Sequence, residues 1–290
     1  MNMVYNIERY DNIVAHNADC RDVMRQMVDE GKTVDLTITS PPYDDVRTYN
    51  HSSTWNFDVF KEIAELLYKV TSDGGVVVWV VGDGVYNGSE SGTSFRQALY
   101  FMECGFKLHD TMIYEKNSSS FPARKGSKRY TQIFEYMFVF VKGKIHDCNL
   151  IADKENKWAG FTNWGNNTQY NKDGELIQTN NIKPVPKFSL RNNIWKYSVG
   201  FNTKKFGKHP AVFPLQLAVD HILSWSLPEH VIFDPFLGSG TTMDACVRTK
   251  RNNFIGCEID SEYFDIIRKK VEYYREGNLL QKSAKKDANS

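Results

Sequence analysis

Two short stretches of the 290-residue chain carry residue types that can do chemistry on a flat, nitrogen-containing molecule. The first is Ser40-Pro41-Pro42-Tyr43. Each proline lacks a backbone N–H and fixes φ, so helix and sheet both stop at this bend. Its carbonyl oxygens can accept hydrogen bonds from an amino group, while Tyr43 offers a ring for stacking. The alternative interpretation is a proline-stiffened turn with a core tyrosine.

The second stretch is Asp234-Pro235-Phe236-Leu237-Gly238-Ser239-Gly240-Thr241-Thr242. An apolar strand is predicted before it at 231–233, and a helix after it at 243–249. A strand, a Gly-x-Gly turn and a helix together place backbone N–H groups and a helix N-terminus against a nucleotide-like ligand. The next predicted strand, 253–257, ends in Glu258, at about the spacing from Gly238 that lets an acid reach ribose hydroxyls.

The glycine pattern does not suit a nicotinamide dinucleotide. Met243 stands where the dinucleotide fingerprint has its third glycine, which allows close strand–helix packing around a pyrophosphate. A ligand with ribose and adenine but no pyrophosphate fits better. The sequence therefore indicates S-adenosylmethionine.

The elements around these stretches alternate between strand and helix, which predicts an α/β fold. Residues 145–207 lack a long hydrophobic period and interleave aromatic residues with lysine and asparagine. Such a composition suits base stacking and phosphate contact, or a small irregular subdomain with its own core. Further strands are expected at 12–17, 34–39, 76–81, 108–114 and 133–141, and further helices at 19–27, 57–70, 94–103, 214–225 and 263–275.

Charge is distributed unevenly although the net charge is only +1. Residues 107–208 contain 18 lysines and arginines against 8 acidic residues, whereas residues 1–106 contain 8 against 16. A basic middle between acidic flanks is typical of a surface that faces phosphates. A solvated lysine-rich loop region is the alternative.

The composition also argues against several other classes. The five cysteines are dispersed without a Cys-x-x-Cys pair, which favours reduced thiols and a cytoplasmic protein over a metal site. The longest apolar run, 76–81, is a strand length and far too short to span a membrane. We therefore expect no metal and no membrane partner.

The motif at 40–43 and the turn at 234–242 together resemble the DNA amino-methyltransferases. Their order, with the catalytic motif first, a basic region in the middle and the cofactor turn last, resembles the beta class of that family. Segments 114–117, 129–135 and 208–214 are similar to further family segments. The resemblance covers residues 12–144 and 205–272. It implies a circularly permuted Rossmann-like methyltransferase sheet with helices on both faces and an inserted target-recognition region.

The resemblance also implies a division of labour along the chain. It makes 1–144 the catalytic half of the methyltransferase domain, 145–204 the target-recognition insert, 205–275 the cofactor-binding half and 276–290 a flexible tail. Asp260 competes with Glu258 for the ribose, and Glu258 is preferred because it directly follows its strand. The implied catalytic residues are Ser40, Pro41, Pro42 and Tyr43. The implied cofactor-binding residues are Asp19, His209, Phe213, Asp234, Phe236, Gly238, Ser239, Gly240, Thr241 and Glu258. The implied DNA contacts are Arg47, Lys116, Arg124, Lys125, Lys128 and Arg129.

The implied reaction moves a methyl group from S-adenosylmethionine to an exocyclic amino group of a base flipped out of double-stranded DNA. In this family a serine before Pro-Pro more often accompanies cytosine N4, so Ser40 favours cytosine, with adenine N6 as the alternative. An RNA or protein amide methyltransferase and an inactive DNA-binding module are weaker alternatives. The resemblance further suggests a homodimer and, in a restriction-modification setting, a cognate restriction endonuclease.

Overall fold

The structure is a computed structural model, and its described residues form two compact units. Unit 1 comprises Met1–Asn149 and Asn193–Ser290, and unit 2 comprises Leu150–Asn192. The described residues are 6–42, 55–118, 126, 128–146, 148–162, 167–179, 183–198, 206 and 214–277.

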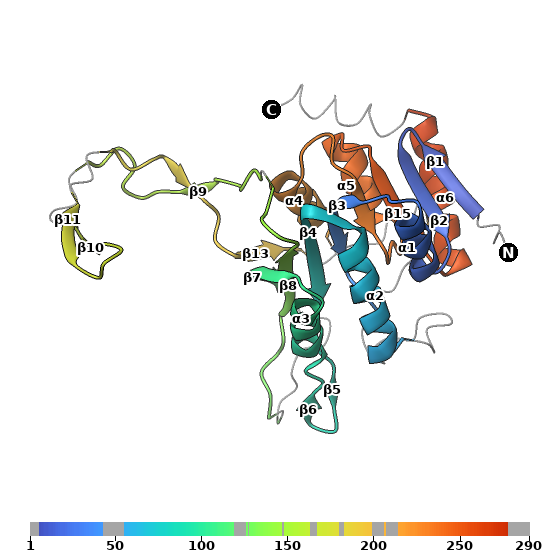
Figure 1. The fold of residues 1–290 in the computed structure, drawn as a ribbon, viewed down its shortest axis with the longest axis horizontal. Helices are drawn as coiled ribbons and strands as arrows, with labels where there is room; N and C mark the ends of the chain where they lie inside the picture. Colours follow the sequence, from blue (N-terminus) through green and yellow to red (C-terminus); the bar gives the residue numbers. More distant parts are fainter. Residues whose placement is uncertain are drawn as a thin grey trace. The chain divides into compact units, whose positions relative to one another are not determined.

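Unit 1 is built on a nine-stranded sheet in the order β1-β2-β15-β14-β3-β4-β8-β7-β13 (Figure 1). The five strands from β2 to β4 in this order run parallel, and β1 and β8 are antiparallel to their neighbours. The strands are β1 (Asn6–Tyr10), β2 (Ile13–Asn17), β3 (Val34–Thr39), β4 (Thr71–Val81), β7 (Lys107–Lys116), β8 (Phe134–Val141), β13 (Ile194–Tyr197), β14 (Ile232–Asp234) and β15 (Phe254–Glu258).

Helices cover both faces of this sheet, as predicted. On one face α1 packs beside α2 and α2 beside α3, while α4 and α5 pack together on the other (Figure 1). Side chains cap three of the helices at their N-termini: Asp19 for α1, Asn56 for α2 and Asp260 for α6. The helices are α1 (Cys20–Asp29), α2 (Phe57–Val70), α3 (Thr93–Glu103), α4 (Leu215–Trp225), α5 (Thr241–Thr249) and α6 (Ser261–Arg275).

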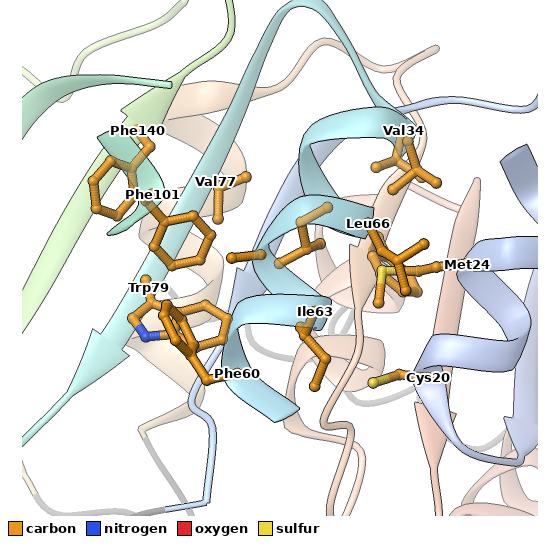
Figure 2. Packing of buried hydrophobic residues seen from close by; sticks show 14 of the residues in the cluster. Cys20, Met24, Val34, Phe60, Ile63, Leu66, Val77, Trp79, Phe101 and Phe140 are labelled. Atoms are coloured by element: carbon orange, nitrogen blue, oxygen red, sulfur yellow. The ribbon is translucent and has the colours of Figure 1, made fainter. Parts of the chain in front are cut away.

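The main core lies between the sheet and helices α1 to α3. Figure 2 shows Phe60 of α2 and Phe101 of α3 packed around Trp79 of β4. The rings of Phe60 and Phe101 lie 5.8 and 5.0 Å from that of Trp79. Trp79 also donates its indole N–H to Gln97 Oε1 at 2.8 Å, so the one polar atom of this aromatic cluster is satisfied.

The strand order explains how distant parts of the chain meet. β14 lies between β15 and β3, and β15 pairs with β2 near the N-terminus, in the register Glu258 to Asn17. The carboxyl ends of β2, β15, β14, β3 and β4 therefore share one edge. Ligands of open α/β sheets bind at such an edge, where the strand order reverses. The sheet is permuted, as the resemblance implied.

Unit 2 contains two small antiparallel pairs, β9 with β12 and β10 with β11. Unit 1 adds one further pair, β5 with β6, after β4. β13, which lies inside the segment 145–204, belongs to unit 1 and pairs with β7. These short strands are β5 (Val85–Tyr86), β6 (Ser89–Glu90), β9 (Lys154–Glu155), β10 (Asn167–Tyr170), β11 (Leu176–Thr179) and β12 (Phe188–Ser189).

Candidate active site

The carboxyl edge of the sheet brings together the two stretches that the sequence singled out. β3 ends at Thr39, directly before Ser40, and the neighbouring β14 ends at Asp234. Pro41 is buried and Pro42 half-buried, so the start of the Pro-Pro bend is fixed against the protein. Tyr43 and Arg47 lie outside the described residues.

Asp234 is a buried carboxylate that joins these two strands. Its Oδ1 accepts from the Thr39 hydroxyl at 2.6 Å and from the Phe236 N–H at 3.0 Å. Its Oδ2 accepts from the Thr242 hydroxyl at 2.6 Å. Burial raises the pKa of Asp234 to about 6, although these hydrogen bonds act in the opposite direction. Asp234 is thus enclosed by protein donors.

The turn after β14 requires glycine at two positions. Gly238 and Gly240 have φ of +54° and +84°, in the left-handed region. A Cβ on Gly240 would also meet the Met243 side chain at 3.2 Å. Gly240 caps α5 without a side chain, so no capping group stands between the first turn and a ligand. Ser239 is half-buried beside it, and Thr241, the first residue of α5, is buried.

Glu258 holds this turn from the neighbouring strand. Its Oε2 accepts from the Gly238 N–H at 2.7 Å and its Oε1 accepts from the Asp260 N–H at 2.8 Å. Burial raises the pKa of Glu258 to about 7, against these two bonds and with the charges of Asp260 and Asp234 adding to the rise. The carboxylate therefore lies beside the glycine turn and is bonded to it.

The competing acid, Asp260, already has another partner. Its Oδ1 accepts from the backbone N–H groups of Glu262 at 2.8 Å and Tyr263 at 3.1 Å, as the cap of α6. Asp19 is similarly engaged: it caps α1 and pairs with Arg21 at 2.6 Å. Burial alone would raise its pKa, but the hydrogen bonds and charge of Arg21 hold the pKa of Asp19 below its usual value.

Two apolar features at this edge escaped the sequence analysis. Ile259, between the two acids, is 67% exposed, which offers a free apolar surface beside Glu258. The rings of Trp55 and Phe236 lie edge to face, with their centroids 5.4 Å apart. The Phe236 ring centroid lies 6.1 Å from that of Trp79. An apolar residue directly after an acid at a strand end could have signalled Ile259. No local pattern predicts the contact of Trp55 with the cofactor turn.

A pocket of about 170 Å³ opens at the N-terminal ends of α2 and α3. Its walls combine two aromatic side chains with the Arg96 guanidinium, which lies 4.1 Å from the Phe57 ring centroid. The lining residues are Trp55, Asn56, Phe57, Thr93, Arg96 and Gln97.

Two of the residues predicted to contact DNA take part in ion pairs. Lys116 pairs with the buried Glu135 at 2.6 Å and is only 23% exposed. Arg129 is 43% exposed, lies 3.5 Å from Glu90 and donates to the Gly88 carbonyl. Lys128 is exposed. Arg124, Lys125 and the predicted cofactor residues His209 and Phe213 lie outside the described residues.

Over the described parts of the chain, no cluster of three or more His, Cys, Asp or Glu side chains could hold a metal ion. No helix in those parts is long and apolar enough to cross a membrane.

Comparisons with known proteins show the family of the chain. A family model described as DNA methylase, for N6 and N4 methyltransferases, matches residues 34–269. The orphan methyltransferase M.BamHII of Bacillus amyloliquefaciens is 50% identical over 246 residues, which cover 83% of this chain and 90% of that protein.

Two solved structures share the fold at lower identity. PvuII DNA methyltransferase, described as cytosine-N4-specific, superposes with a TM-score of 0.62 at 18% identity, covering 89% of this chain and 87% of its own. The complex of M1.HpyAVI with SAM superposes with a TM-score of 0.56 at 24% identity, covering 89% of this chain and 98% of its own.

The chain belongs to the DNA methylase family of N6 and N4 amino-methyltransferases. It is an enzyme, and its cofactor is S-adenosylmethionine. The residues present fit that cofactor: a glycine turn on a helix N-terminus, a carboxylate at the next strand end and an exposed apolar side chain beside it.

Proposed function

We propose that this enzyme methylates N4 of cytosine in double-stranded DNA, on a base flipped out of the helix. The observation that carries this proposal is the position of Ser40 at the carboxyl end of β3, next to the β14 strand that leads into the cofactor turn. A base inside the duplex cannot reach such an edge, so it must leave the stack.

The chain's own residues supply acceptors and alignment. The Ser40 hydroxyl and the Pro41 carbonyl accept the N–H bonds of the amino group, which favours a more tetrahedral nitrogen with an available lone pair. Bound S-adenosylmethionine supplies an electrophilic methyl group on a sulfonium centre. As the new N–C bond forms, the S–C bond breaks, and the nitrogen then loses a proton to water. Most of the rate comes from alignment and electrostatics, since no covalent enzyme intermediate is needed.

The resemblance supports cytosine, because a serine before Pro-Pro more often accompanies that base, and a hydroxyl that both donates and accepts also suits it. In cytosine the amino group, a donor, adjoins the ring nitrogen N3, an acceptor, and one serine can serve both. Adenine offers N6 and N1 in a similar arrangement, so adenine N6 is the second candidate.

Glu258 is proposed to hold the cofactor's ribose, and Gly238 and Gly240 to let it approach the backbone. Asp19 reaches an adenine amino group only if its carboxylate keeps a lone pair free of Arg21. Tyr43 is proposed to stack on the target base. Residues 145–204 are proposed to recognise the DNA sequence, with Arg47, Arg124, Lys125, Lys128 and Arg129 contacting phosphates. A homodimer and a partner endonuclease remain predictions from the resemblance.

The test is nucleoside mass spectrometry on unmethylated plasmid treated with the enzyme and S-adenosylmethionine. N4-methylcytosine is the expected product. N6-methyladenine would retain the reaction and overturn the role of Ser40 in selecting the base. A Ser40→Ala variant is the matched control for methylation by a contaminating enzyme. No methylated nucleoside from DNA covering all short sequences would overturn DNA as the substrate.

A further inference from the structure

Asp234 was predicted from the resemblance to bind the cofactor, but its surroundings indicate another role. The side chain is 1% exposed. Thr39 and Phe236 donate to one oxygen and Thr242 to the other. A carboxylate that accepts from three protein donors holds those parts of the protein together and has a structural role.

We propose that Asp234 is a positioning residue that fixes the catalytic motif against the cofactor turn. Thr39, Asp234 and Thr242 form what we call the carboxylate clamp. One end of the clamp precedes Ser40 directly, and the other lies in the first turn of α5, after Gly240. The inference rests on the proposed function, because it assigns the clamp to the alignment of the amino nitrogen with the methyl group.

The strand pairing shows why a clamp is needed at this point. The ladder between β14 and β3 pairs Ile232 with Leu36 and Phe233 with Thr37, and includes no later pair. Thr39 and Asp234 lie just beyond it, where the two strands lead into different loops. The 2.6 Å bond between their side chains continues the connection past the last backbone pair.

A carboxylate suits this position better than a neutral group. It accepts from all three donors and carries no hydrogen of its own, whereas an amide keeps one oxygen and would turn its NH2 group toward at least one of these donors. Charge-assisted hydrogen bonds are also shorter and stronger than neutral ones, so they define a distance more sharply.

The sequence offers a matched pair of variants on one strand. Thr39 and Thr37 both lie on β3, both are fully buried, and as residues two apart they face the same side. The Thr37 hydroxyl has no hydrogen-bond partner among the described residues, whereas the Thr39 hydroxyl binds Asp234. Replacing either with valine exchanges a hydroxyl for a methyl group of similar size.

The experiment compares Thr39→Val, Thr37→Val and Thr39→Ser with the wild type. Thr39→Val should lower kcat by about 10- to 100-fold, the effect expected of a small misplacement, with little change in the Kd of S-adenosylmethionine measured calorimetrically. Thr39→Ser should restore kcat, and Thr37→Val should match the wild type. Equal kcat for the two valine variants would overturn the clamp, as would a loss confined to cofactor affinity.

Hydrogen exchange gives a readout that does not depend on turnover. Thr39→Val should accelerate exchange of the backbone amides at 238–242, far away in sequence, and Thr37→Val should not. Unchanged exchange there would overturn the clamp. If the wild type methylates no DNA, the proposed function fails, and the exchange data alone still decide whether the clamp exists.

Discussion

The two units of the molecule differ in the burial of their aromatic residues. In unit 1, Phe60, Trp79 and Phe101 are fully buried against one another. In unit 2, none of the described residues is buried, and Trp158 is 59% exposed. Unit 2 therefore does not build a core from its described residues. Of the two interpretations of its composition, the exposed aromatic side chains favour contact with a partner such as nucleic acid over an internal core.

The difference suggests that different interactions stabilise the two units. Unit 1 offsets its conformational entropy by burying apolar area. The described part of unit 2 relies on short strand pairs and polar contacts, such as the ion pair of Arg191 with Asp153 and the bond from Ser189 to Asn156 at 2.7 Å. Such contacts are individually weak at a surface. Substitutions in the two units should reveal this contrast.

A core truncation should separate the units most clearly. Phe101→Ala in unit 1 should lower the free energy of unfolding by about 3–5 kcal/mol, through lost burial and the cavity left behind. Phe161→Ala in unit 2, where the ring is 45% exposed, should change it by no more than about 0.5 kcal/mol. Chemical denaturation measures both. A similar loss of unfolding free energy in the two variants would contradict the difference in burial between the units.

Within unit 1, Glu258→Gln should weaken S-adenosylmethionine binding by about 10- to 100-fold at pH 8, because hydrogen bonds to a charged acceptor are lost. In the wild type the affinity should rise with pH up to about 7, where this carboxyl ionises. The variant should show no such rise. Calorimetric titration across pH 5.5 to 8.5 measures this, and a flat wild-type profile would contradict it.

The same carboxyl should make stability depend on pH. Its pKa in the fold, about 7, lies above the ordinary 4.5. Its contribution to stability is therefore fully present below pH 4.5 and is lost as the pH rises through 7. Asp234, with a pKa of about 6, acts in the same direction. The unfolding free energy of Glu258→Gln should fall less steeply than that of the wild type over this range.

In unit 2, Trp158→Ala should weaken binding of duplex DNA by about 2 kcal/mol, because tryptophans are among the side chains that most often dominate the energy of an interface. Its unfolding free energy should stay within about 0.5 kcal/mol of the wild type. Fluorescence anisotropy and denaturation measure the two quantities. A loss of stability with unchanged DNA affinity would show that the tryptophan is structural.

The smallest effect should come from single phosphate contacts. Arg129→Gln should reduce the slope of log affinity against log salt by about 0.9, the value of one released counterion. Lys116→Gln should leave the slope nearly unchanged, because its ammonium group already pairs with Glu135. Instead it should destabilise the protein, since it leaves a buried carboxylate without its partner. Equal slopes for the two variants would contradict a phosphate contact by Arg129 alone.

The sequence predicted the regular elements of unit 1 well, because apolar periodicity and glycine or proline boundaries mark them locally. Helix α2 was predicted with its observed bounds, Phe57–Val70. The permuted sheet that the resemblance implied is confirmed. β1 and β13 escaped notice because they are short and largely exposed, with no alternating pattern strong enough to identify them.

The chemistry of the site was only partly readable. Residue type and spacing singled out Ser40, Gly238 and Glu258. They could not show that Asp234 is enclosed by Thr39 and Thr242, since the first of these bonds spans 195 positions of the chain. Likewise, a lysine in a basic segment predicts a phosphate contact, and only the fold shows that Lys116 pairs with Glu135.

The strand order also governs how the protein can be made. β2 and β3 follow one another in the chain, yet β15 and β14 lie between them in the sheet. These two central strands are synthesised last. Until then, the edges of β2 and β3 that will pair with β15 and β14 are unpaired. Unpaired edges invite association with other chains. We therefore expect the sheet to close only after residue 258 has left the exit tunnel, and chains arrested before β14 to aggregate.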